Sequence, residues 1–325
     1  MVKLASEKGI YRITLPTPFL VGPVNVYIIK GDTLTLVDTG PGTDEAWAVL
    51  KKELTSLGID PEDIEQVIIT HHHPDHTGMV HKFFRKARIL GHWKNEPWLQ
   101  KDQHFLAEVR SFFQSLSRTA GVPDVLTEKI IQNQAAYQKY ISTASLTYRL
   151  NNGDSVPGLP GWRSYEVPGH AQSHIILYEE QTGIIIGGDH LLAHISSNAI
   201  IEAPYNNKDS RPRTLLQYRE SLLLCTELPV SMVYPGHGDS FDKPHALIEK
   251  RLNEQNNRAE YIYHMIKDNP GKTAFAVSKE LFPRVYQKQP DLTLSEVIGH
   301  LDLLLVHGRI KEDCFGDQII YSNYE

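Results

Sequence analysis

The alternation of apolar and polar residues over the first seventy positions predicts strands with one helix among them. Runs rich in β-branched residues, bounded by proline and glycine, predict strands at 10–15, 24–30, 33–40 and 66–70. Apolar residues recur at helical spacing over 44–57, so we expect a helix there that Gly58 ends. A further helix is expected from Met79 to Lys86.

The apolar pattern then changes between residues 94 and 141. Large apolar residues recur every three to four positions, which predicts a long amphipathic helix from about 98 to 116 and a second from about 125 to 141. Strands are expected before this pair, at 88–91, and after it, from 147. The pair therefore has the form of an insertion, which either covers a site as a lid or packs its apolar face on a sheet; both can hold together.

The second half predicts strands at 163–167, 173–180, 184–187 and 232–234, with a helix at 213–228. After residue 242 the pattern is helical, at 244–267, 274–281 and 294–307, and it ends in a hairpin. Three helices followed by a hairpin are typical of a winged-helix domain. We therefore expect a catalytic domain at 1–242, with the helical lid at 94–141, and a small winged-helix-like domain at 243–325.

Composition narrows the class of protein. The chain of 325 residues is 41% hydrophobic and 22% charged, which is enough apolar material for a proper core. Its formal net charge of −6 gives no general attraction for nucleic acid or anionic lipid. The two cysteines, Cys225 and Cys314, form neither a disulfide framework nor a metal-spaced pair. With no signal-like or membrane-length apolar run, we expect a cytoplasmic protein without a membrane.

The first candidate chemistry lies at the end of the 66–70 strand. Residues 70–78 read Thr-His-His-His-Pro-Asp-His-Thr-Gly, so histidines and a carboxylate crowd a strand end. Alternation along an extended segment points His71 and His73 one way and His72 the other. The turn after Pro74 brings Asp75 and His76 round towards the same point. Imidazole nitrogen and carboxylate oxygen are the ligands that zinc takes, so the stretch predicts a metal site.

Three further polar residues follow glycine at predicted strand ends. They are His170 in Pro-Gly-His, Asp189 in Gly-Gly-Asp and His237 in Pro-Gly-His-Gly. Each alone would be read as a turn residue. Together with His71, His73, Asp75 and His76 they supply seven ligands, which is enough for two adjacent metal ions.

The ordered set His-x-His-x-Asp-His, a later His, an Asp and a final His resembles the metallo-β-lactamase superfamily over about residues 10–242. The turn Asp38-Thr39-Gly40 resembles the early strand and turn of the same superfamily. The resemblance implies an α/β fold, an αββα sandwich of two sheets with helices on both outer faces. It also implies that His71, His73 and His170 hold one metal, that Asp75, His76 and His237 hold the second, and that Asp189 bridges them.

The resemblance further implies a mechanism. A hydroxide bridging the two metals is the expected nucleophile, Asp75 orients it and accepts its proton, and Asp38 supports the ligand loop by hydrogen bonding. Zinc is the default metal, although iron and manganese accept the same ligands. A bridging Asp189, where metallo-β-lactamases carry Cys or Ser, disfavours antibiotic hydrolysis. The C-terminal segment resembles that of glyoxalase-II-like proteins related to β-lactamase-like protein 2.

Three hypotheses for the substrate remain open. The first is hydrolysis of a small ester or thioester, or of a lactone, with Trp93, Trp98, Phe105, Phe112, Tyr137 and Tyr205 as candidates to line an apolar pocket under the lid. For each aromatic, core packing is the better expectation. The second is cleavage of RNA, for which Lys243, Lys250, Arg251 and Arg258 would form a basic stripe, although this segment has about as many acidic as basic residues. The third is a metal-stabilised binding protein without turnover.

The remaining assignments are modest. The C-terminal segment is expected to cap the catalytic domain or to contact a second subunit in a homodimer, rather than to bind nucleic acid. The other histidines, including His72, His92, His104, His174 and His264, are expected at the surface or in the ordinary core. His190 and His194 are near enough to Asp189 to support it.

Overall fold

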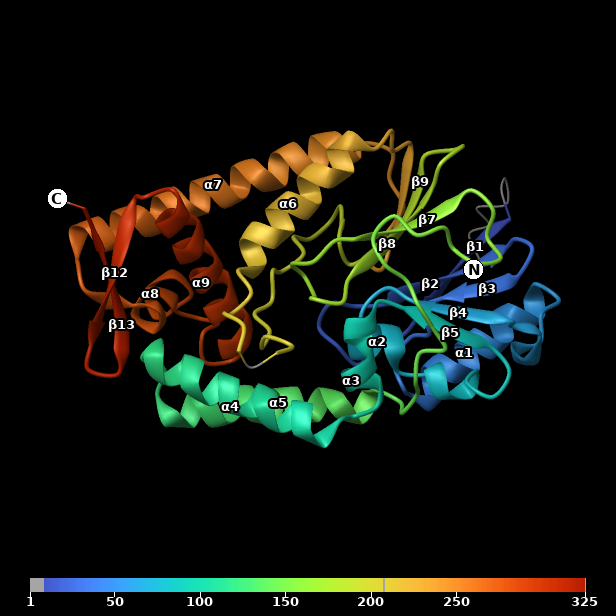
Figure 1. The fold of residues 1–325 in the computed structure, drawn as a ribbon, viewed down its shortest axis with the longest axis horizontal. Coiled ribbons are helices and arrows are strands. Elements are labelled where there is room, and N and C mark those ends of the chain that lie inside the picture. Colours follow the sequence, from blue (N-terminus) through green and yellow to red (C-terminus); the bar gives the residue numbers. More distant parts are fainter. Residues whose placement is uncertain (1–8, 207, 325) are drawn as a thin grey trace. The chain divides into compact units, whose positions relative to one another are not determined.

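The computed structural model describes residues 9–206 and 208–324, and it divides into two compact units (Figure 1). The first unit comprises residues up to Asp102, Ala136–Ser197 and Leu224–His245. The second comprises Gln103–Ala135, Asn198–Leu223 and the chain from Ala246 onwards. Most of the 94–141 insertion belongs to the second unit, together with residues 198–223 and the C-terminal segment. The division into a catalytic domain at 1–242 and a winged-helix-like domain at 243–325 stays a prediction.

The first unit contains a six-stranded sheet whose strands follow one another in chain order. They are β1 (Ile10–Leu15), β2 (Val24–Lys30), β3 (Leu34–Val37), β4 (Gln66–Ile69), β5 (Arg88–Gly91) and β6 (Tyr148–Arg149). The first three are antiparallel neighbours, whereas β3 to β6 run parallel. Parallel neighbours place their carboxyl ends at the same edge of the sheet. Residues 70–78, which we call the ligand stretch, begin at one of these ends, directly after β4.

A second sheet of four strands completes the first unit. Its order is β10-β9-β8-β7. These strands are β7 (Trp162–Glu166), β8 (Ile175–Glu179), β9 (Ile184–Gly188) and β10 (Met232–Pro235). His170 lies in the loop between β7 and β8. Asp189 follows the end of β9 and His237 follows the end of β10, and these two ends are neighbours because β9 and β10 are parallel.

The core of the first unit lies on both faces of the six-stranded sheet, as the period of two in β-strands requires. One set of buried residues packs beneath helix α1 (Asp44–Ser56) and includes Val26 and Ile28 of β2. The alternate residues Tyr27 and Ile29 belong to a second cluster, shared with β8 and β9 of the four-stranded sheet. The two sheets therefore face each other across an apolar interior.

Contacts near the ligand loops fasten the two sheets together. The Tyr27 hydroxyl donates to the Pro235 carbonyl over 2.7 Å. The side chain of Asn25 donates to the carbonyls of Pro235 and Gly238, and its backbone N–H donates to Gly236. Because these groups flank His237, the same contacts hold the two sheets together and fix the position of that predicted ligand.

The second unit is mostly helical. Its helices are α4 (Gln103–Thr119), α8 (Ala274–Leu281) and α9 (Pro290–Val306), with most of α5 (Asp124–Tyr137), of α6 (Thr214–Glu227) and of α7 (Pro244–Asp268). A small antiparallel sheet has the order β11-β13-β12, formed by β11 (Lys272–Thr273), β12 (Ile310–Phe315) and β13 (Gln318–Asn323). Three helices and a hairpin thus follow one another as expected; that this segment is a winged-helix domain stays a prediction.

α9 is the central helix of the second unit. Twelve of its 17 residues are buried, which explains why its apolar pattern extends over most of its surface rather than along one stripe. Gly299 lets α6 approach, since a Cβ there would lie 2.8 Å from the Cβ of Leu215. The turn after α4 packs on the start of α8, where the Phe275 N–H donates to the Ala120 carbonyl.

Two predicted helices differ from the structure. The helix expected from Met79 to Lys86 is wrong: a single α-turn, α2 (Pro74–Thr77), lies inside the ligand stretch, and only a 3-10 turn follows at Val80–Lys82. Proline at the first helical position favours this earlier start. The long helix expected from about 98 is broken into α3 (Glu96–Leu99) and α4, with Lys101 between them in the left-handed region at φ 52°.

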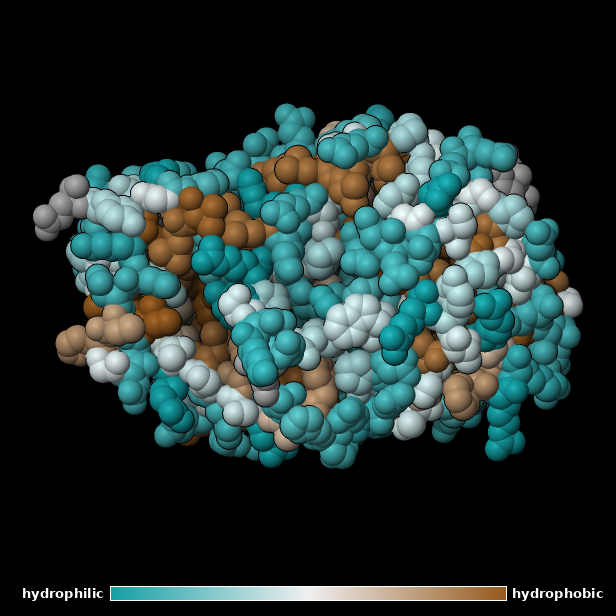
Figure 2. Space-filling view, in the orientation of Figure 1, coloured by the Kyte–Doolittle hydropathy of each residue, from teal (hydrophilic) through white to brown (hydrophobic). Residues whose placement is uncertain are grey.

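Surface chemistry gives little further guidance. Polar side chains cover most of the face shown in Figure 2, and apolar ones gather over α6 and α7. Large exposed apolar residues in the second unit include Leu223, Tyr261 and Phe315. Among the residues that the structure describes, no helix combines the length and the apolar character needed to cross a membrane.

Candidate metal centre

The ligand stretch leaves β4 and folds back at once into the short helix α2. His73 precedes that helix in an extended conformation, and Pro74 begins it. The turn buries Asp75 and His76, while Thr70 receives the N–H of Ile175 on its carbonyl. Local chain geometry, rather than a long helix, therefore brings the ligand stretch against the second sheet.

Three imidazoles form the first cluster, which we call the histidine triad: His71, His73 and His170. The Nδ1 atom of His73 lies 3.0 Å from Nε2 of His71 and 3.1 Å from Nε2 of His170. The three rings stand edge to face, with centroids 4.6 to 5.2 Å apart. Their ligand atoms lie within 4.8 Å of one another, as a shared metal requires.

Hydrogen bonding assigns the tautomer of His71. The Thr70 hydroxyl donates to Asp38, so it accepts from Nδ1–H of His71, 3.0 Å away. Nε2 of His71 then carries a lone pair directed at His73 Nδ1. Converging nitrogens at such short separations repel unless a proton or a cation lies among them. The histidine triad is accordingly suited to a metal ion.

A second cluster, the carboxylate triad, consists of Asp75, His76 and His237. Nε2 of His237 lies 3.3 Å from a carboxylate oxygen of Asp75, and Nε2 of His76 lies 3.9 Å from the other. Nδ1 of His237 donates to the carbonyl of Pro23 over 2.7 Å, which directs Nε2 inward. This set too has ligand atoms within 4.8 Å of one another.

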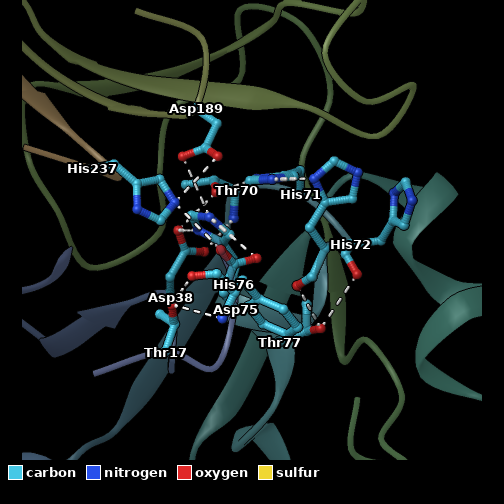
Figure 3. Close-up of polar contacts among 12 residues, drawn as sticks. Thr17, Asp38, Thr70, His71, His72, Asp75, His76, Thr77, Asp189 and His237 are labelled. Carbon is cyan, nitrogen blue, oxygen red and sulfur yellow. Dashed lines mark hydrogen bonds and ion pairs between the residues drawn. The ribbon is translucent and has the colours of Figure 1, made fainter. Parts of the chain in front are cut away.

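Asp189 lies between the two triads. One carboxylate oxygen is 3.4 Å from Nε2 of His76; the other is 3.4 Å from Nε2 of His237 and 3.6 Å from Nε2 of His170. Figure 3 shows Asp189 entering from the second sheet, with His76 and Asp75 below it and His237 beside it. A grouping of His71, His76 and Asp189 also meets the 4.8 Å limit, so the two triads are contiguous.

The two triads differ in charge. Burial, reinforced by neighbouring imidazoles, holds the pKa values of His71 and His73 well below their usual range. Burial also opposes the imidazolium form of His76, but Asp189, Asp38 and Asp75 outweigh it and hold the pKa of His76 well above the usual range. Burial lowers the pKa of His237 too, but the carboxylates of Asp189 and Asp75 outweigh burial and raise that pKa to about 10.

The residues fit divalent metal ions. Nε2 of His76, Oδ1 of Asp189 and Nε2 of His237 are buried, and among the described residues they have no hydrogen-bond partner. Buried polar atoms without partners are costly in an ordinary core. Here they converge on one point with imidazole and carboxylate donors, which is the ligand chemistry of zinc and related ions.

The outer nitrogens of the ligands are held by a second set of groups. Asp38 accepts from Nδ1 of His76 over 2.7 Å and from both the backbone N–H and the hydroxyl of Thr70. Ser197 lies 3.0 Å from Nδ1 of His170. Asp38 itself has a positive φ of 59°, a strained conformation for a non-glycine residue. The predicted supporting contact of Asp38 is therefore present.

Two glycines make room for side chains at the centre, Gly236 for Asp189 and Gly188 for Thr70. A Cβ at Gly236 would lie 2.3 Å from Oδ1 of Asp189 and 3.0 Å from the ring of His76. A Cβ at Gly188 would lie 2.8 Å from the hydroxyl of Thr70. The glycines that precede Asp189 and His237 are thus required by close approach and not only by turn geometry.

All seven predicted ligands lie together in the first unit. His72 points away, as alternation predicts: its ring stacks on Trp98 with centroids 4.4 Å apart and contacts the hydroxyl of Ser173. Burial, followed by His170, lowers the pKa of His72 to about 3. Phe105 is buried against Tyr205 within the second unit, so core packing is its observed role.

Sequence reasoning missed Ser197, the carbonyl of Pro23 and His174. Ser197 and Pro23 are distant in sequence from the histidines that they hold, and nothing in local spacing singles them out. His174 was expected to be an ordinary core histidine. Its position four residues after His170, in the same loop that ends at β8, was the available signal.

Comparisons with known proteins agree with this geometry. Residues 20–237 match the model of the metallo-beta-lactamase superfamily. The chain is 44% identical to the probable metallo-hydrolase YqjP of Bacillus subtilis, over 98% of each chain. A metallo-beta-lactamase family protein of Thermus thermophilus superposes with a TM-score of 0.81 at 25% identity, covering 97% of this chain and 99% of that one.

More distant relatives are also similar. A β-lactamase-like protein 2 homologue of Drosophila melanogaster is 23% identical over 94% of this chain and 90% of its own. The thioesterase pkgB of Emericella nidulans is 27% identical over 74% of this chain and 54% of its own length. The resemblance to β-lactamase-like protein 2 is therefore distant, whereas the match to the superfamily and to its fold is strong. This chain belongs to the metallo-beta-lactamase superfamily and is a metallo-hydrolase of that superfamily.

Proposed function

We propose that the protein hydrolyses a small ester or thioester at a centre of two divalent metal ions. The observation that carries this proposal is the position of Asp189, whose two oxygens lie against His76 on one side and against His170 and His237 on the other. A carboxylate in that position suits a bridge between two ions. The histidine triad would hold one ion and the carboxylate triad the other.

Bound metal ions would supply Lewis acidity here, activating water near neutral pH and polarising the acyl carbonyl. The chain supplies the rest. Asp75, which is 7% exposed and has a carboxylate oxygen 3.3 Å from Nε2 of His237, would orient the attacking water and accept its proton. Asp38 and Ser197 hold the imidazoles of His76 and His170 in fixed orientations.

Zinc is the metal that we favour, since five imidazoles and two carboxylates suit it; iron and manganese accept the same ligands. Support for acyl chemistry comes from one relative that is a thioesterase, and from the aspartate at position 189 in place of the Cys or Ser of the metallo-β-lactamases. A lactone, as a cyclic ester, belongs to the same substrate class.

The alternative of RNA cleavage has less support in the second unit. Three of the four basic residues of the predicted stripe, those on α7, lie beside glutamates. Lys250 and Arg251 both contact Glu254, and Arg258 lies 3.8 Å from Glu296. These two glutamates offset part of the positive charge, which weakens the attraction of the stripe for a phosphate backbone.

A substrate panel tests the proposal directly. Purified protein would be loaded with zinc and assayed on acyl-thioesters, simple esters, lactones, bis(p-nitrophenyl) phosphate and a single-stranded RNA, with metal content measured by mass spectrometry. We expect two metal ions per chain and turnover of the acyl compounds, both lost in Asp75→Ala. Turnover of the phosphodiesters alone would refute the acyl assignment, and one metal ion per fully active chain would refute the two-metal centre.

A further inference from the structure

His174 occupies a junction between the loops that carry the ligands. Its Nε2 atom accepts the backbone N–H of Asp189 over 3.1 Å. Its ring stacks on that of His71, with centroids 4.6 Å apart and an interplanar angle of 21°. It also lies at the end of the loop that contains His170. One side chain therefore contacts a ligand of the histidine triad, adjoins the loop of another, and holds the residue between the two triads.

The hydrogen bond to Asp189 excludes His174 as a metal ligand through Nε2 and fixes its tautomer. Because Nε2 accepts, the proton of the neutral ring is on Nδ1. That Nδ1 atom is buried and has no hydrogen-bond partner among the described residues. A buried N–H without a partner costs about 1–3 kcal/mol. An imidazole at this position is thus poor for stability alone, which points to a role in the metal centre.

The surrounding backbone is shaped to this ring. A Cβ at Gly188 would lie 3.0 Å from both Cε1 and Nε2 of His174, and Gly188 adopts a positive φ of 47°. The carbonyl of His174 accepts the N–H of Val167, and its own N–H donates to Ala171. Both the ring and the peptide of His174 are held, so the position of its Nε2 atom is well defined.

We propose that His174 is a positioning residue of the metal centre, which fixes the backbone of Asp189 between the two triads and sets the plane of the His71 ring. The two contacts use different features of the imidazole. The acceptor nitrogen holds Asp189, and the flat face holds His71. Each feature can be removed without the other.

Two substitutions separate these features. His174→Phe keeps a flat ring but removes the acceptor, leaving the Asp189 N–H unpaired. His174→Gln can present an acceptor near the place of Nε2 but has no ring. Asp189 contacts both triads, whereas His71 belongs to the histidine triad alone. We therefore expect His174→Phe, which frees Asp189, to weaken the binding of both metal equivalents about 10–100-fold, the range typical of groups that orient ligands. His174→Gln should recover most of that loss for one equivalent.

Titration of the metal-free full-length protein with Co²⁺ measures both equivalents, by visible absorption and by competition with a chelator. His300→Phe is the matched control, since His300 is equally buried, lies in the second unit, which contains none of the predicted ligands, and hydrogen-bonds to the carbonyl of Glu296. It should lower the melting temperature without altering the cobalt spectrum or affinity. Should His174→Phe fail to fold, the cobalt spectrum and affinities of His174→Gln still decide whether the ring of His174 orients His71.

The inference rests on the two-metal arrangement proposed above, but not on any substrate. A substrate panel without turnover would leave it intact, because binding of cobalt is the readout; wild-type protein that binds no cobalt would instead overturn the metal centre itself. Wild-type affinity and spectrum in both His174 variants would refute the positioning role. A fall in melting temperature with unchanged metal binding, as in His300→Phe, would show that the ring only packs.

Discussion

The histidine triad and the carboxylate triad lie against the same aspartate, yet they hold protons in opposite ways. His71 and His73 have pKa values pushed down by burial and by one another, so they are neutral at pH 7. His76 and His237 have pKa values raised by nearby carboxylates, despite burial. One triad is therefore ready for a cation, and the other already holds positive charge in the form of protons.

The difference arises mainly from the carboxylates of Asp189 and Asp75, which lie beside His76 and His237, and at His76 also from the partner of its outer nitrogen. His71 turns its outer nitrogen to a hydroxyl, and so does His170, whereas His76 turns its outer nitrogen to the carboxylate of Asp38. Neutral partners fix orientation without changing charge. A carboxylate partner also increases the basicity of the ring. Two similar sets of imidazoles are thus given different affinities for protons by the carboxylates around them, of which only Asp38 is not itself a predicted ligand.

Removal of the Asp189 carboxylate should abolish the difference between the two triads, because both depend on it. In Asp189→Asn the carboxylate common to both triads is lost, so we expect activity to fall at least about 1,000-fold and metal content to fall at both triads. The metal-free protein should also lose about 3 kcal/mol of unfolding free energy, because buried imidazolium groups lose a partner. Metal analysis, steady-state kinetics and urea unfolding measure these effects.

Asp302→Asn is the control for that experiment. It breaks a buried ion pair with Arg211 in the second unit, where the two groups lie 2.7 Å apart. Stability should fall while the number of metal ions per chain is unchanged. Equal loss of metal in both variants would mean that Asp189 acts only through the fold.

The pH dependence of metal affinity should differ between the two triads. A metal ion needs neutral imidazole, and the pKa of His237 in the metal-free protein is about 10. Affinity at the carboxylate triad should therefore rise about tenfold per pH unit for each proton displaced, until pH approaches 10. Affinity at the histidine triad should be nearly constant above pH 7, since its rings are already neutral there.

Isothermal titration calorimetry in buffers of different ionisation enthalpy would count the protons released at each equivalent of metal. The two equivalents should differ, with release confined mainly to one of them. Equal proton release at both would contradict the assignment of different charge to the two triads.

The smallest effects should come from the groups that hold the outer nitrogens. Asp38→Asn removes the carboxylate beside His76 but keeps a similar shape, and should reduce metal affinity about 10–100-fold. Ser197→Ala removes only a neutral hydroxyl from His170, and we expect about a tenfold loss or less. Chelator competition on both variants measures the contrast; a larger effect of Ser197→Ala would reverse the proposed importance of carboxylate partners.

Much of this arrangement could be predicted from the sequence because ligands sit at strand ends and follow glycine or proline. The ligand stretch, His170, Asp189 and His237 all have such local signals, and strands such as 10–15 and 24–30 match their predicted bounds. Ser197 and the carbonyl of Pro23 have none, and the spacing of His174 from His170 does not indicate that its ring stacks on His71, since these contacts depend on how distant loops pack. The grouping of residues 103–135 with the C-terminal helices was hidden for the same reason: an apolar stripe does not reveal its partner.

The contacts of Asn25 and Tyr27 with the backbone around His237 have a consequence for folding and metal binding during synthesis. His71 and His73 emerge from the ribosome long before His237, and the sheet that carries His237 is completed only by β10. A growing chain can hold a cation loosely through its early histidines, but the full set of ligands exists only after β10 has docked against β2. Tight metal capture would then mark the completion of the first unit, so that a truncated product ending before residue 232 would be left without it.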